Sequence, residues 1–167
     1  MGIKFLNTTL TYKINNEQRS SIQHYGIMHV SNLLIWENMF VNGLLDMEQS
    51  NINNLKVIGK TKITNSTITG NYLIITGSLM IKDSQINCIS SFCSSNIKIS
   101  NSSIMQKIII EKKSRLVVFK ELLILDHSTV NGDIIFESGK GIIISYVSTI
   151  NGVIRGGQFI DYDTSHY

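Results

Sequence analysis

The sequence of 167 residues contains no alanine and no proline, and it has only two cysteines. Alanine is the strongest helix former, whereas the β-branched isoleucine and threonine that are plentiful here suit the pleated surface of a β-sheet. Hydrophobic residues make up 43% and charged residues 16%, which excludes a disordered chain and a highly solvated helical one. The length is sufficient for one domain with a continuous core. These features predict a single all-β domain.

Targeting, metal and nucleic-acid signals are weak. Cys88 and Cys93 match no zinc-binding spacing, and we expect two buried reduced thiols. Residues 1–10 lack the apolar stretch of a signal peptide, and no apolar run approaches the ~20 residues of a membrane helix. The net charge of +3 is small, and the basic stretch at 112–115 lacks interleaved aromatic residues. We therefore expect a cytoplasmic protein with no nucleic-acid partner, and membrane association is the second option for its location.

A triplet of serine, any residue and an aliphatic residue recurs along the chain. The aliphatic positions are separated by 16 to 20 residues, apart from one interval of 26. Serine is common here, so an isolated match carries little information, but near-constant spacing indicates an internal structural repeat. The triplets begin at Ser31, Ser50, Ser66, Ser84, Ser102, Ser128 and Ser148.

The residues around the triplets predict how each repeat folds. An Asn-Gly step follows the last two triplets, and such a step tolerates the positive φ that a tight corner needs. Between triplets, apolar and polar residues alternate over four to six positions, which is typical of half-buried strands. The sequence therefore predicts a single-stranded parallel β-helix (β-solenoid) of about six to seven coils, each of ~18 residues, with strands that pair with their counterparts one coil further along. The predicted corner positions, whose side chains stack and bond to one another or to the turn backbone, are Ser50, Ser66, Ser84, Ser102, Ser128, Ser148, Asn131, Gly132, Asn151 and Gly152.

The repeat divides the chain into three parts. Residues 1–30 lack the triplet at the proper spacing, and we expect them to form an N-terminal cap or the first strands. Residues 31–160 form the β-helix, with an enlarged coil or an inserted loop near 111–125, and 161–167 form a short tail. Repeat arrays need atypical ends, because a terminal coil otherwise exposes an unpaired edge and a cross-section of the core.

The aliphatic-Asn-Gly coils are clearest at 130–135 and 150–157. In these segments the chain resembles the bactofilins, a bacterial family of polymer-forming scaffold proteins, over about residues 31 to 160. The resemblance implies a right-handed β-helix that assembles end to end into nucleotide-free filaments, often near the membrane or the cell envelope. It implies no catalytic residues, so the expected partner is a second copy of the chain, with the membrane or envelope as a further candidate.

We predict a non-enzymatic structural scaffold that self-assembles through its terminal coils and holds no cofactor or metal. Phe159 and Ile160 follow the last complete repeat. They either cover the end of the core or form the surface that meets the next subunit, and they are the candidate self-association residues.

Two other functions are open. A left-handed hexapeptide-repeat acyltransferase also has 18-residue coils, and a six-residue spacing links Ile68, Ile74, Met80 and Ile86. Such an enzyme uses a histidine as the base, and His127 is the candidate. A surface or secreted adhesin is the other alternative. A carbohydrate-cleaving enzyme would need carboxylates clustered on one face, whereas the repeats scatter them over different coils, at Asp46, Asp83, Asp126 and Asp133.

Overall fold

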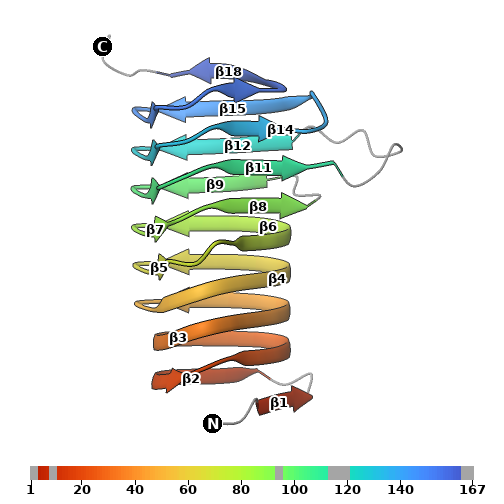
Figure 1. Cartoon of the computed structure of the whole chain (residues 1–167), viewed down its shortest axis with the longest axis vertical. Helices are drawn as coiled ribbons and strands as arrows, with labels where there is room; N and C mark the ends of the chain where they lie inside the picture. Colours follow the sequence, from red (N-terminus) through yellow and green to blue (C-terminus); the bar gives the residue numbers. More distant parts are fainter. Residues whose placement is uncertain (1–3, 8–10, 93–95, 113–120, 163–167) are drawn as a thin grey trace.

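The computed structural model describes residues 4–7, 11–92, 96–112 and 121–162, and these residues form strands and turns without a helix. The strands run parallel and stack into one continuous coil of about eight turns (Figure 1). The predicted fold class, a parallel β-helix of six or seven coils, is therefore confirmed.

The coil changes its construction along the chain. In the first half, long strands follow the bend of the coil without interruption, whereas later coils are divided into three short strands (Figure 1). The strands of the first half are β1 (Lys4–Asn7), β2 (Tyr12–Arg19), β3 (Ile22–Glu48), β4 (Asn51–Thr64), β5 (Thr67–Ile68) and β6 (Leu73–Lys82). Those of the second half are β7 (Gln85–Ile86), β8 (Ile89–Phe92), β9 (Asn96–Ser100), β10 (Ser103–Ile104), β11 (Ile108–Glu111), β12 (Glu121–Asp126), β13 (Thr129–Val130), β14 (Ile134–Phe136), β15 (Gly141–Tyr146), β16 (Thr149–Ile150), β17 (Ile154–Arg155) and β18 (Gly157–Asp161).

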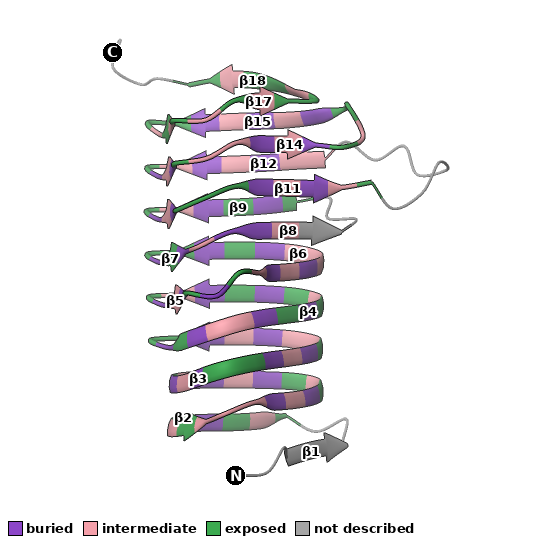
Figure 2. Ribbon diagram, viewed as in Figure 1, coloured by how far each residue is buried: buried purple, intermediate pink, exposed green. Residues whose placement is uncertain are grey.

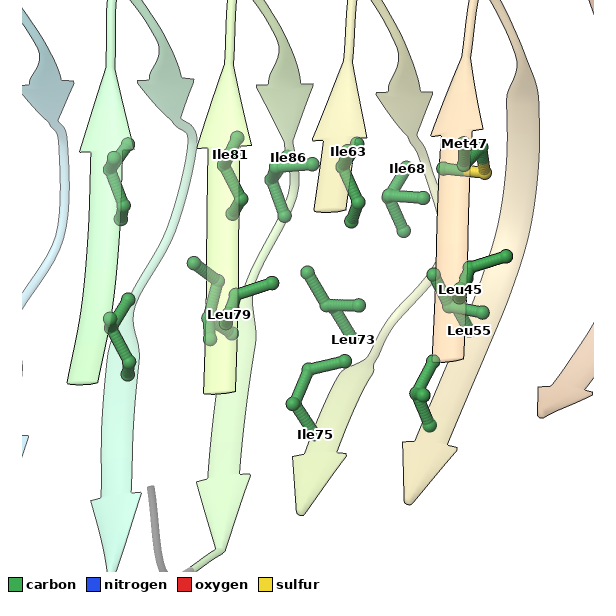
Figure 3. Packing of buried hydrophobic residues seen from close by; sticks show 14 of the residues in the cluster. Leu45, Met47, Leu55, Ile63, Ile68, Leu73, Ile75, Leu79, Ile81 and Ile86 are labelled. Atoms are coloured by element: carbon green, nitrogen blue, oxygen red, sulfur yellow. The ribbon is translucent and has the colours of Figure 1, made fainter. Parts of the chain in front are cut away.

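The core is a stack of aliphatic layers inside the coil. Because side chains alternate between the two faces of a strand, every second residue points inward, and the parallel register places each inward residue over its equivalent one coil away. Ile63 thus lies opposite Ile81, and Ile68 lies opposite Ile86 (Figure 3). The buried positions form continuous bands across successive strands (Figure 2). A single coil cannot bury its own inner face, so its stability depends on its neighbours.

Each coil turns at a residue in the left-handed backbone region. Most of these residues are asparagine or aspartate, which tolerate that conformation better than other non-glycine residues. The serine of the triplet follows immediately at six of the corners. The corner residues, with φ between 45° and 54°, are Asn16, Asn32, Gln49, Asn65, Asp83, Asn101, His127 and Val147.

The corner serines form a hydrogen-bonded ladder along the coil. The backbone N–H of Ser66 donates to Oγ of Ser84 at 3.1 Å, and the N–H of Ser84 donates to Oγ of Ser102 at 3.1 Å. Each Oγ in turn donates to the carbonyl two residues earlier, as Ser84 does to Lys82 at 2.7 Å. This arrangement satisfies backbone amides at a position where the turn interrupts ordinary strand pairing. The same ladder joins Leu33 to Ser50, Ser50 to Ser66, Ser102 to Ser128, and Ser128 to Ser148.

One predicted triplet is out of register. Ser31 is not a corner serine, because the structure pairs Leu34 with Asn51 and Ile35 with Ile52. Leu33 therefore occupies the serine position, and its N–H donates to Oγ of Ser50. A shift of two residues keeps the same side chains facing inward, so alternation alone does not distinguish the two registers.

The two Asn-Gly steps do not adopt the positive φ that the sequence predicted for them. Gly132 and Gly152 lie outside the left-handed region, which is occupied instead by the residues before Ser128 and Ser148. Glycine is required there because successive coils approach closely. A Cβ on Gly132 would lie 1.9 Å from the carbonyl oxygen of Gln106, and one on Gly152 would lie 2.3 Å from that of Gly132.

The two segments that lack the regular repeat, 1–30 and the enlarged coil near 111–125, contain strands that pair with the adjacent coils. In the segment 1–30, Tyr12 of β2 lies opposite Met28 of β3, and Ile14 lies opposite Val30. The coil between the corner serines Ser102 and Ser128 spans 26 residues. Within it, β11 and β12 each pair with strands of both adjacent coils, so the additional residues fall between Glu111 and Glu121. Residues 113–120 and 163–167 lie outside the described part of the chain.

Candidate functional site

The last turn of the coil leaves one end of the stack open among the described residues. Strands β16, β17 and β18 each pair with the preceding coil, and within the described ranges no strand pairs with their other edges. A strand edge of this kind presents free N–H and C=O groups that can pair with another chain. No described residue after Ser145 is buried (Figure 2). The end of the core is therefore the first candidate surface.

Phe159 occupies an inward position of this last turn. It lies opposite Ile143, which lies opposite Leu123, and both of these side chains are 0% exposed. Phe159 itself is 43% exposed, although its place in the register is a core position. Ile150 and Ile154, the other two inward aliphatic residues of the turn, are half-buried and pack on the core. The end of the stack is thus an apolar surface with Phe159 as its most exposed inward residue.

Ile160, the second predicted self-association residue, lies on the other face of β18. It pairs with Ile144, which pairs with Ile124, and all three are half-buried side chains of the outer surface. The structure therefore brings Phe159 together with the core cross-section and places Ile160 on the side of the rod. A surface that meets the end of the stack would contact Phe159 directly and Ile160 at its margin.

Other apolar side chains near this end were not predicted from the sequence. Tyr146 and Tyr162 stack with ring centroids 5.4 Å apart and an interplanar angle of 17°, and they are 38% and 50% exposed. Val147 and Val153 are more than half exposed. The two tyrosines are separated by about one coil length, which was the available sequence signal. Exposed apolar residues therefore extend beyond Phe159 over the whole last turn.

The same end carries one carboxylate at a core position. Asp161 lies opposite Ser145, and Ser145 lies opposite the buried Leu125. The Oγ of Ser145 is fully buried and has no hydrogen-bond partner among the described residues. The inward column that contains Leu125 is therefore aliphatic in the earlier coils and polar in its last two layers, at Ser145 and Asp161. This charge gives the apolar end a polar edge.

His127, the candidate acyltransferase base, is a corner residue exposed on the outside of the coil. Its Nδ1 lies 2.7 Å from Oδ1 of Asp126. Met80, a member of the six-residue series, is 45% exposed, whereas Ile68 and Ile86 are buried. The six-residue spacing therefore does not mark equivalent positions of this coil.

The remaining candidates are dispersed. Cys88 is buried, its Sγ donates to the carbonyl of Asn71 at 2.6 Å, and burial raises the pKa of its thiol. Cys93 lies outside the described residues. Asp46 contacts Lys62 and His29, both at 3.6 Å. The part of the chain that the structure describes holds no cluster of three or more side chains suited to a metal ion.

The corner serines are fully committed to the fold, since each Oγ both donates and accepts a hydrogen bond within the ladder.

Within the described ranges, no helix is long and apolar enough to cross a membrane. Comparisons with protein-family models, with curated proteins and with solved structures find no match for this chain.

Proposed function

We propose that this protein is a structural scaffold whose copies associate end to end through the last turn of the β-helix. The observation that carries the proposal is Phe159, a residue in a core column that is 43% exposed because no described coil covers it. The bactofilin resemblance of the sequence supports the same function. The partner is a second copy of this chain.

Both the hydrophobic effect and backbone pairing favour such an association. Complete burial of an exposed phenylalanine side chain contributes about 1.5–3 kcal/mol. Because Phe159 is 43% exposed, covering it contributes roughly half of that amount or less, and Ile150 and Ile154 would lose their remaining exposure as well. A strand placed on the free edge of β18 would continue the parallel ladder at the spacing used inside the molecule. The proposed partner surface is the N-terminal coil of the next copy, so the contact is heterologous and the assembly grows into a filament.

Replacement of Phe159 by glutamate tests this proposal. A buried, unpaired carboxylate at the centre of the contact would oppose association, so we expect the Phe159→Glu protein to sediment as a smaller species than the wild type. The matched control is Met80→Glu, which adds the same charge to a residue of similar exposure, 45%, on the side of the rod. Sedimentation velocity over a range of concentrations measures the effect, and circular dichroism checks that both variants keep the fold.

The proposal is wrong if the wild type stays monomeric at high concentration. It is also wrong if Phe159→Glu and Met80→Glu reduce association equally, because the contact would then not lie at the end of the stack.

A further inference from the structure

A shallow groove runs along the corner ridge of the coil. One section, of about 630 Å³, is lined by residues from Asn16 to Asn65, and a second, of about 640 Å³, is lined by residues from Asn65 to His127. Asn65 belongs to both sections, so the two sections adjoin at this residue and together cover the ridge from the first corner to the seventh. At the strand spacing of ~4.8 Å, this path is roughly 30 Å long.

Amide and hydroxyl side chains dominate this surface. At each of the first six corners the lining includes the corner residue and the residue two positions further along the chain. No lysine or arginine is among the described residues that line the groove. Its two carboxylates are paired with neighbouring bases, Glu17 with Arg19 and Asp83 with Lys82. The amide and hydroxyl residues of the lining, apart from the corner serines, are Asn16, Gln18, Asn32, Gln49, Asn51, Asn65, Thr67, Gln85, Asn101 and Ser103.

Several of these side chains are free to bind a ligand. In the described part of the chain, the amides of Gln49, Asn51 and Asn65 make no hydrogen bond to the protein. Their backbones, in contrast, are fixed by bonds between coils. The N–H of Gln49 donates to Thr64, and that of Asn65 donates to Lys82, both at 3.1 Å. The backbone positions that carry these amides are thus spaced regularly along the ridge, one coil apart.

We infer that this groove, which we call the amide groove, binds an extended, uncharged polysaccharide. Sugar hydroxyls both donate and accept hydrogen bonds, and so do amide and hydroxyl side chains. A repeating ligand matches a site that repeats once per coil over seven corners. A nucleic acid or another polyanion would need a line of cationic side chains, which this face lacks. The inference is independent of the end-to-end association.

The test is affinity electrophoresis in native gels that contain hydroxyethyl cellulose, laminarin or glucomannan, with a heparin gel as the polyanion arm. The test variant is Thr67→Val/Gln85→Leu, which removes two polar groups that lie opposite each other in adjacent coils of the groove. The control is Ser78→Val/Lys60→Leu, which replaces a hydroxyl and a long polar side chain, here a charged one, by aliphatic residues at a paired position on another face of the rod.

We expect at least one neutral glycan to retard the wild type. We expect the groove variant to bind about tenfold or more weakly, because each hydrogen bond contributes roughly two- to tenfold in affinity. The control should bind as the wild type does. The proposal is overturned if no neutral glycan retards the protein, if only heparin does, or if the control variant loses as much binding as the groove variant.

Discussion

Val147 is the one β-branched residue at a left-handed corner of the described coil, with φ of 48°. Its equivalents in other coils of the same stack include Asn101 and Asn65, whose short polar side chains tolerate this conformation. The left-handed region costs a β-branched residue roughly 1–2 kcal/mol. Val147 is also 52% exposed, so it repays little of this cost by packing.

Replacement of Val147 by asparagine should therefore stabilise the protein. We expect a gain of about 1 kcal/mol and a midpoint of thermal unfolding raised by about 2–4 °C, measured by calorimetry. Val153→Asn is the control, since Val153 is 56% exposed and its φ is not positive. An equal gain in both variants would show that the change of side-chain polarity, and not the backbone conformation, is responsible.

The serine ladder is the element that holds the corners in register. Ser102 is 7% exposed, its Oγ donates to Ser100 at 2.6 Å, and it accepts the N–H of Ser84 at 3.1 Å. Alanine at this position would leave a buried amide without an acceptor.

We expect Ser102→Ala to lower the free energy of unfolding by about 1–3 kcal/mol, measured by denaturant titration. The neighbouring Ser103→Ala makes the same chemical change at a half-buried hydroxyl whose hydrogen bond goes only to the sulfur of Met105. We expect that control to change stability by less than about 0.5 kcal/mol. If the two variants are equally stable, the ladder does not hold the corners.

Much of the coil follows from the spacing of these serines, and the reason is physical. A residue that must satisfy a backbone amide one coil away recurs once per coil, so it produces a periodic signal. The periodic serine is missing at Leu33, the first position of the ladder. The backbone N–H of Leu33 donates to Oγ of Ser50, so this position needs no serine of its own. The serine spacing therefore does not reveal the position of the first corner in the ladder.

A second column escaped sequence analysis. Gly26, Gly43, Gly59 and Gly77 stack with positive φ, and a Cβ on Gly59 would lie 1.9 Å from the carbonyl oxygen of Gly43. Their spacing of one coil was visible in the sequence. It stops at Gly77 of β6, the last strand that runs through this corner without interruption, and four isolated glycines do not form a recognisable motif.

At the scale of the whole molecule, the structure is a rod with two distinct kinds of surface. At the end near Phe159 the continuous core stops and its cross-section is exposed. Along the sides, the backbone groups of each coil pair with those of its neighbours. Phe159 could be predicted as a candidate from the sequence because it follows the last repeat. The sequence could not separate Phe159 from Ile160, since only the register shows that one faces the core and the other the side of the rod. The amide groove depends on the same register and was not predicted.

Fibre diffraction from aligned assemblies tests end-to-end association most directly. If copies join through the last turn, the strand spacing of ~4.8 Å lies along the axis of the assembly and produces a meridional reflection. Association through the sides of the rod would place that spacing across the axis and move the reflection to the equator. End-to-end association predicts filaments with the meridional reflection. Filaments with an equatorial reflection, or a protein that forms no filaments, would contradict it.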